Sequence, residues 1–402
     1  MTGRKSAAFN RAPGFVLGVV WCALAWSPGF AQDAKTKTLI QQLQSPEQFA
    51  RMAAAGKVAE LGPGAADAAP ALIEALKCER MDVMFENPQI AASRRSFADS
   101  LVRLGSPVTP QIEQALNDAN GLVRVWSAYA LFKIDSVKHR GKVVRALMDS
   151  LREDDDTAAD AAMVLELMGS DAAPAIPLLI QQLAHADLGV RCNSAHALVA
   201  IAKGDQLRPL TEALKHEQPL VRVGAAYVLQ RGQRDLSVDA KIVLQEALDN
   251  EASAVRTQAV WAIGQLGSVA QPLAKPLIAV LPRLNPDIRE YFFGGGGLGR
   301  QSFDPSMVLV ATGPKTKEDL IQALEGEDLK GRLMAAVALL RLDPSQKERV
   351  DTVFAAVREA PDQSLRFFAN LSAPPVAPAA KPDLEGLIRE VLQTNGFGPP
   401  SP

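Results

Sequence analysis

Aromatic residues, cysteine and histidine are scarce in this chain, and neither charge sign dominates it. Of 402 residues, 5% are Phe, Trp or Tyr, 3 are cysteine and 4 are histidine. So few aromatic residues disfavour a β-rich fold, whose strands are enriched in them. The formal net charge of −2 excludes a strongly basic nucleic-acid binder as the default. No CxxC, CxxCH or HExxH spacing occurs, so the sequence predicts no metal, no cofactor and no catalytic residue. A site assembled from several segments stays open.

The first 31 residues have the pattern of an export signal. Three basic residues precede an apolar run from Phe15 to Trp26, and small residues follow up to Ala31. The run is too short to span a bilayer comfortably. We expect cleavage between Ala31 and Gln32 and a periplasmic or secreted protein with no other membrane contact; an uncleaved anchor is the alternative. Loss of three basic and no acidic residues takes the net charge from −2 to about −5.

One motif recurs along the rest of the chain: Val-Arg-x-x-x-Ala-x-Ala-Leu-x-x-Ile. It reads VRVWSAYALFKI from Val123, VRCNSAHALVAI from Val190 and VRTQAVWAIGQL from Val255. Copies recur about every 33 residues, which is enough for two short helices and their turns. The repeat arginines, looser copies included, are Arg51, Arg94, Arg124, Arg191, Arg222, Arg256, Arg289 and Arg332.

The spacing of apolar residues within a copy predicts a helix. Counted from the arginine, positions +3, +4, +6, +7 and +10 are apolar, which places them on one side of a helix. A glycine at +11 predicts a left-handed helix end, and an early proline often opens a second helix. These glycines are Gly62, Gly105, Gly169 and Gly267. Because a lone helix pair cannot bury its apolar side, we expect an all-α solenoid of about ten stacked pairs over residues 32–372.

The motif resembles the HEAT repeat, in particular the short bacterial HEAT-like repeats named after phycobilisome lyases. The resemblance covers roughly residues 45–372 and implies an α-α superhelix acting as a non-catalytic scaffold for an unidentified protein or peptide partner. The family also suggests a chromophore lyase or isomerase, or a nucleic-acid-binding protein similar to HEAT-like DNA glycosylases. An export signal disfavours both alternatives, and the acidic mature chain disfavours nucleic acid. HEAT-like deoxyhypusine hydroxylases bind iron with several His-Glu pairs, and only His216-Glu217 occurs here.

Two segments interrupt the repeat period. Gly294-x-Gly296-x-x-Gly299 has the spacing of a dinucleotide-binding loop, but a repeat helix rather than a strand is expected before it. We therefore predict a glycine-hinged surface insertion over residues 294–314, either tolerated or used by Arg300 and Phe303 to bind a partner. A second insertion, with the same two interpretations, begins at Cys78. Residues 373–382 read as a Pro/Ala linker, and 383–402 as a capping helix with a flexible tail.

Position +5 of the motif holds large residues in five consecutive copies. It lies nearly opposite the apolar stripe on a helical wheel, so we expect these residues to align as an exposed ridge that binds the partner. The alternative is that each ring lies across the seam between neighbouring helices. The residues are Tyr129, Met163, His196, Tyr227 and Trp261, flanked by Trp126.

The repeat arginine also has two interpretations. It could form a ladder that binds anions, or it could bond carbonyls and acids between adjacent repeats. We expect the structural role, since Glu47, Asp187 and Asp328 each precede an arginine by four residues, where they could cap a helix. The two cysteines of the mature chain, Cys78 and Cys192, fall in distant repeats, so we expect two separate thiols.

Overall fold

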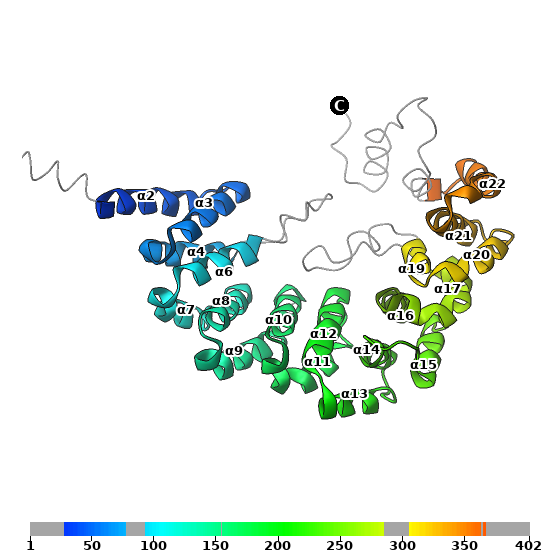
Figure 1. The fold of residues 1–402 in the computed structure, drawn as a ribbon, viewed down its shortest axis with the longest axis horizontal. Helices are drawn as coiled ribbons and strands as arrows, with labels where there is room; N and C mark the ends of the chain where they lie inside the picture. The colour runs from blue at the N-terminus through cyan, green and yellow to red at the C-terminus, as the bar shows by residue number, and fades with distance from the viewer. Residues whose placement is uncertain (1–27, 78–92, 154, 285–304, 363–364, 367–402) are drawn as a thin grey trace, which may run out of the picture. The chain divides into compact units, whose positions relative to one another are not determined.

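The computed structural model describes residues 28–77, 93–153, 155–284, 305–362 and 365–366. Every regular element in these ranges is a helix, as Figure 1 shows. The chain divides into two compact units, residues 1–146 and residues 147–402. Each unit is a series of helix pairs, so the predicted all-α solenoid is confirmed.

The first unit stacks its repeats on a row of long helices. Helix α3 contacts α6, and α6 contacts α8, while the shorter helices α4 and α7 pack against the long helix that follows each of them. Helix α9 begins in this unit and ends in the next. The elements are α2 (Pro28–Leu43), α3 (Gln48–Leu61), η1 (Gly62–Ala68), α4 (Ala69–Ala75), α6 (Ser93–Leu104), η2 (Ser106–Val108), α7 (Thr109–Ala115), α8 (Gly121–Ile134) and α9 (Ser136–Ser150).

The second unit repeats this arrangement. Its long helices contact one another in the order α10, α12, α14, α16, α19, α21. The elements are α10 (Asp155–Met168), η3 (Gly169–Ala175), α11 (Ile176–Gln182), α12 (Leu188–Ile201), η4 (Gly204–Leu207), α13 (Arg208–Ala213), α14 (Pro219–Gln230), α15 (Val238–Leu248), α16 (Ser253–Leu266), η5 (Gly267–Leu273), α17 (Ala274–Val280), η6 (Leu281–Arg283), α19 (Pro305–Ala311), η7 (Pro314–Thr316), α20 (Lys317–Ala323), α21 (Leu329–Leu342), η8 (Pro344–Gln346) and α22 (Lys347–Arg358).

Glycines end the long helices as the motif predicts. Gly62, Gly105, Gly169 and Gly267 all have φ between 58° and 74°, which confirms the predicted left-handed conformation. Side chains with a Cβ rarely adopt this φ, so glycine lets the chain turn sharply into the second helix. Small residues in the long helices allow close stacking. A Cβ added at Gly224 of α14 would lie 2.7 Å from a methyl group of Leu183.

The glycine-rich insertion ends earlier than the sequence suggested. Residues 285–304, which include Arg289, Arg300 and Phe303, lie outside the described residues. Residues 305–311, however, form α19, which packs between α16 and α21. Gly313, with φ of 101°, then ends this helix in the way the other glycines end theirs. The expectation that residues 305–314 belong to a surface insertion is therefore wrong, because residues 305–311 form a helix packed in the array and Gly313 ends it.

Helix α2 caps the N-terminal end of the first unit. Its buried residues Thr36, Leu39 and Leu43 lie on one side, and α2 contacts α3, η1 and α4. Lysine, threonine and glutamine side chains occupy the exposed positions of the opposite side. A polar outer face is what a terminal unit of a repeat array needs for solubility.

One apolar stretch, residues 156–182, is long enough to cross a membrane by length and composition alone. It is not one continuous helix, because Gly169 separates α10 from η3 and α11. Its residues include a run of buried alanines and leucines that pack against α12. We interpret it as the core of one repeat. The remaining predicted segments, residues 373–382 and 383–402 and the insertion at Cys78, lie outside the described residues.

Candidate functional site

The large residues at position +5 do align, but four of them are buried and His196 is half-buried. Tyr227 and Trp261 are 0% and 3% exposed, and Met163 is 6% exposed. The expectation of an exposed ridge is therefore wrong for these residues, and the rings lie in the seams between neighbouring helices. The physical reason is that a long helix contacts the preceding long helix, the following one and the short helices beside it. Three contacts leave only a narrow exposed strip, which a two-sided helical wheel does not anticipate.

Three successive helices of the second unit share one aromatic cluster, which we name the ring ladder: His196 on α12, Tyr227 on α14 and Trp261 on α16. The ring centroids lie 4.8 Å apart for Tyr227 and Trp261, 5.5 Å for His196 and Trp261, and 5.8 Å for His196 and Tyr227. The Tyr227 hydroxyl lies 3.3 Å from His196 Nδ1. Burial raises the pKa of Tyr227 to about 12. A neutral phenol among packed rings serves stacking.

The first unit holds a second aromatic pair. The Trp126 and Tyr129 rings meet edge to face with centroids 5.6 Å apart, and the two residues are 1% and 2% exposed. The Tyr129 hydroxyl donates to Asp99 Oδ1 at 2.7 Å, and Lys133 Nζ lies 5.8 Å from the ring centroid. Burial, followed by the bond to Asp99, raises the pKa of Tyr129 to about 12. These two rings are also interior, against the expected exposed ridge.

The repeat arginines bind main-chain carbonyls at the end of the preceding repeat. Arg191 Nη1 donates to the carbonyls of His185 and Ala186 at 2.6 and 2.7 Å, and its Nε donates to Gln258. Arg51, Arg222 and Arg256 bond the carbonyls six and five residues before them in the same way. Arg124 bonds the carbonyl six residues before it, and Arg332 bonds a carbonyl eight residues before it. These bonds are of the kind expected of a structural arginine.

Side chains complete the same turns. Asp187 and Asp328 accept the backbone N–H three residues later and cap α12 and α21 as predicted. Glu47 stands at the cap position of α3 without such a bond. His185 and His216 lie six residues before their arginines, and their Nδ1 atoms accept the N–H two residues on, at 3.1 Å. This turn is not among the sequence predictions, although a side-chain acceptor stands six places before the arginine in five copies: Ser45, Asp118, His185, His216 and Asn250.

His139 is the most buried histidine, at 3% exposure. Its Nδ1 lies 3.3 Å from Glu113 Oε1, and Lys142 Nζ lies at the same distance from that oxygen. The cluster joins α7 to α9 within the first unit. It contains no nucleophile, so its arrangement supports packing of the two helices rather than proton transfer to a substrate.

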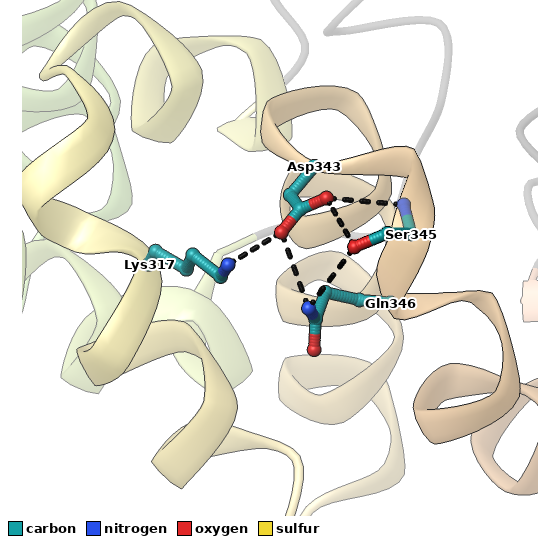
Figure 2. Close-up of polar contacts among 4 residues, drawn as sticks. All are labelled: Lys317, Asp343, Ser345 and Gln346. Atoms are coloured by element: carbon teal, nitrogen blue, oxygen red, sulfur yellow. Dashed lines mark hydrogen bonds and ion pairs between the residues drawn. The ribbon is translucent and has the colours of Figure 1, made fainter.

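Figure 2 shows a polar cluster of the second unit, around Asp343 just after the end of α21. Its carboxylate accepts bonds from Lys317 Nζ, from the Ser345 backbone N–H and hydroxyl at 3.0 and 2.6 Å, and from Gln346 Nε2 at 3.1 Å. Lys317 is the main cause of the lowered pKa of Asp343. A carboxylate with a low pKa is a weak base and would not activate Ser345 as a nucleophile. The cluster clamps α20 to the turn after α21.

A groove with a volume of about 510 Å³ lies beside the N-terminal cap. Helix α2 supplies one wall and α4 the other, and the Arg51 side chain that lines it is bonded to the carbonyls of Ser45 and Pro46. Its lining residues are Ile40, Leu43, Gln44, Ser45, Arg51, Asp67, Pro70, Ala71, Glu74 and Ala75. They include no histidine or cysteine, and they do not form an acid–base pair with a nucleophile.

Metal-ligating side chains do not gather in the described parts of the chain. Within these ranges no group of three or more His, Cys, Asp or Glu residues is placed to hold a metal ion. Cys192 carries a free thiol, and burial raises its pKa, so it is a weak nucleophile at neutral pH. Cys78 lies outside the described residues.

Part of the chain matches a known repeat family. Residues 144–230 and 207–290 match the family model for HEAT repeats. An engineered protein of known structure is 18% identical, with 84% of this chain and 98% of that chain covered and a TM-score of 0.27. The human deoxyhypusine hydroxylase in complex with glycerol is 16% identical, with 78% and 98% covered and a TM-score of 0.24.

Kap121p bound to Ste12p is 10% identical over 90% of this chain, with a TM-score of 0.34, and this chain covers 39% of it. By sequence, no curated protein is similar to the chain.

Proposed function

The chain carries HEAT repeats, and from this premise we propose that it is an exported, non-catalytic scaffold that binds a protein or peptide partner. The observation that supports the proposal most is that the arginine, histidine and tyrosine side chains of the motif form structural contacts. The repeat arginines bond carbonyls, His185 and His216 accept backbone N–H groups, and the tyrosines of the +5 positions are buried. The outer faces of the stacked helices are exposed, and an extended helical surface of this kind suits docking.

Because the ring ladder lies between helices, we place the proposed docking surface in another part of the chain. Arg300 and Phe303, in the glycine-rich segment, remain a predicted contact. We expect the double variant Arg300→Ala/Phe303→Ala to keep the helical circular dichroism of the parent and to recover less partner in affinity purification. Equal recovery of partner by both proteins would remove this segment from the proposal.

The partner is identified by crosslinking in the source cells. The tagged full-length chain is treated with an amine-reactive crosslinker in living cells, purified under denaturing conditions and analysed by mass spectrometry. An unrelated exported protein with the same tag is the matched control. We expect one or a few proteins enriched over the control. Recovery of the chain alone, at several crosslinker concentrations, would contradict the scaffold function.

Two features support export. The basic residues, the apolar run and Ala31 fit a cleavable signal. All the buried residues described for α2, namely Thr36, Leu39 and Leu43, come after the expected cleavage point, so the cap would keep its packing. Cell fractionation with N-terminal sequencing tests this proposal. We expect Gln32 as the first residue of an exported protein, whereas an intact Met1 in the cytosol would refute it.

A further inference from the structure

We propose that the solvent face of α9 is a docking site for an acidic segment of the partner protein. The face consists of Lys138, Lys142 and Arg145, which we name the basic stripe. This inference rests on the proposed scaffold function and assigns a place and a chemistry to its partner.

The helix presents the basic stripe on one side. Its apolar residues Val143 and Val144 are buried, while Lys138, Lys142 and Arg145 are exposed. Positions i, i+4 and i+7 lie within a narrow arc of a helix, so the three cations form a row. The neighbouring Arg140 is also exposed and adds to the charge. No acidic residue occurs from Ser136 to Met148.

This distribution of charge does not stabilise the helix that carries it. Positive side chains near a helix N-terminus face the positive end of the helix dipole, and α9 begins at Ser136. Lys138 and Lys142, four residues apart, repel each other. Asp135 offsets part of this by accepting the Lys138 backbone N–H at 3.0 Å, and Glu113 lies 3.3 Å from Lys142 Nζ. The remaining cost is explained if the stripe serves binding.

The length of the basic stripe favours a short peptide segment as the partner. The rise of 1.5 Å per residue separates successive cations by roughly 6 and 4.5 Å along the axis, so the row is about 10.5 Å long. That is about the length of three residues of an extended segment. Carboxylates flank the row, with Glu113 on α7 and Asp149 in the last turn of α9. These carboxylates confine the basic area to a single row, which suits one acidic peptide segment better than a membrane plane or a nucleic-acid duplex.

The probe is a fluorescein-labelled 12-residue peptide of alternating glutamate and alanine, measured by fluorescence anisotropy in low salt. The test variant is Lys138→Gln/Arg145→Gln, which leaves Lys142 and its contact with Glu113 in place. The matched control is Lys241→Gln/Lys347→Gln, which removes two exposed cations from α15 and α22. We expect the test variant to bind the peptide about five- to tenfold more weakly and the control to bind it like the parent, since exposed ion pairs are individually weak.

Stability gives a second readout. Lys138 lies in the first turn of α9, where a positive charge is unfavourable, and Arg145 lies in the second half of the helix and is exposed. We therefore expect the test variant to unfold at about the same temperature as the parent. A weaker peptide interaction in a variant of equal stability therefore supports docking. Equal peptide binding by test and control variants would overturn the inference. So would tighter binding of the parent to vesicles of anionic phospholipid, or to duplex DNA, than to the peptide.

The two proposals fail separately. If the test variant still crosslinks the cellular partner as the parent does, the scaffold function stands and the basic stripe is not its docking site. If the parent crosslinks no partner, the scaffold function itself fails, whatever the peptide measurement shows.

Discussion

Replacing Trp261 by alanine should destabilise the middle of the second unit. The Trp261 side chain is 3% exposed and contacts the rings of His196 and Tyr227, with centroids 5.5 and 4.8 Å away. Removing a buried aromatic side chain costs about 3–5 kcal/mol, through lost burial and the cavity left behind. Each ring pair contributes about 0.5–1.5 kcal/mol beyond its burial. We therefore expect Trp261→Ala to lower the free energy of unfolding by about 4 kcal/mol.

The assay is urea unfolding followed by circular dichroism, together with hydrogen exchange of the folded protein. In a repeat array the damage is confined to neighbouring repeats, so amides of α12, α14 and α16 should exchange faster while those of α3 are unaffected. The matched control is Ile242→Ala on α15, whose side chain is 50% exposed and whose loss should cost under about 0.5 kcal/mol. If Trp261→Ala and Ile242→Ala unfold alike, Trp261 does not serve stacking.

Three further predictions follow from local geometry. The pKa of Tyr227 is raised to about 12 in the folded protein, so the unfolded chain loses this proton at lower pH and the free energy of unfolding should fall between about pH 10 and 12. In urea unfolding across that range, Tyr227→Phe should lose about 2–3 kcal/mol less than the parent. Because Lys317 lowers the pKa of Asp343, the stability contributed by the ionised carboxylate is present above about pH 4 and is lost in more acid solution. The unfolding temperature of Asp343→Asn should therefore fall less than that of the parent as the pH is lowered, and an equal fall would contradict the clamp. Gly169→Ala should destabilise the protein by about 1 kcal/mol, because φ is 58° there. Gly141→Ala, inside α9, should stabilise it by up to about 1 kcal/mol, because a Cβ there meets no atom within 4 Å. Equal shifts of the urea midpoint in the two variants would refute this reasoning.

Local features of the motif could be predicted because they depend on residues close together in the chain. The glycine at +11 and the cap residue at −4 act within a single turn, and the structure has Gly267 and Asp187 as expected. In most copies the arginine reaches back five or six residues, as Arg222 does to the His216 carbonyl at 2.8 Å. Its carbonyl partners follow from the turn that joins two repeats.

The exposure of the +5 residues and the end of the glycine-rich segment could not be predicted from one copy of the motif. The exposure of Tyr227 depends on α12 and α16, which a helical wheel of α14 does not include. The boundary of the glycine-rich segment was set from Arg289, whereas Val308, Leu309 and Gly313 repeat the +6, +7 and +11 pattern from residue 302. The glycine and the apolar pair mark α19, although Ser302 stands where other copies have an arginine.

Tryptophan fluorescence of the processed chain tests the central claim most directly, namely that the aromatic side chains hold the stack together and leave docking to the outer faces. After removal of residues 1–31, the tryptophans are Trp126 and Trp261, which are 1% and 3% exposed. We predict a blue-shifted emission that iodide barely quenches until urea unfolds the protein. Emission like that of free indole, quenched by iodide in the folded protein, would contradict this and restore the exposed ridge.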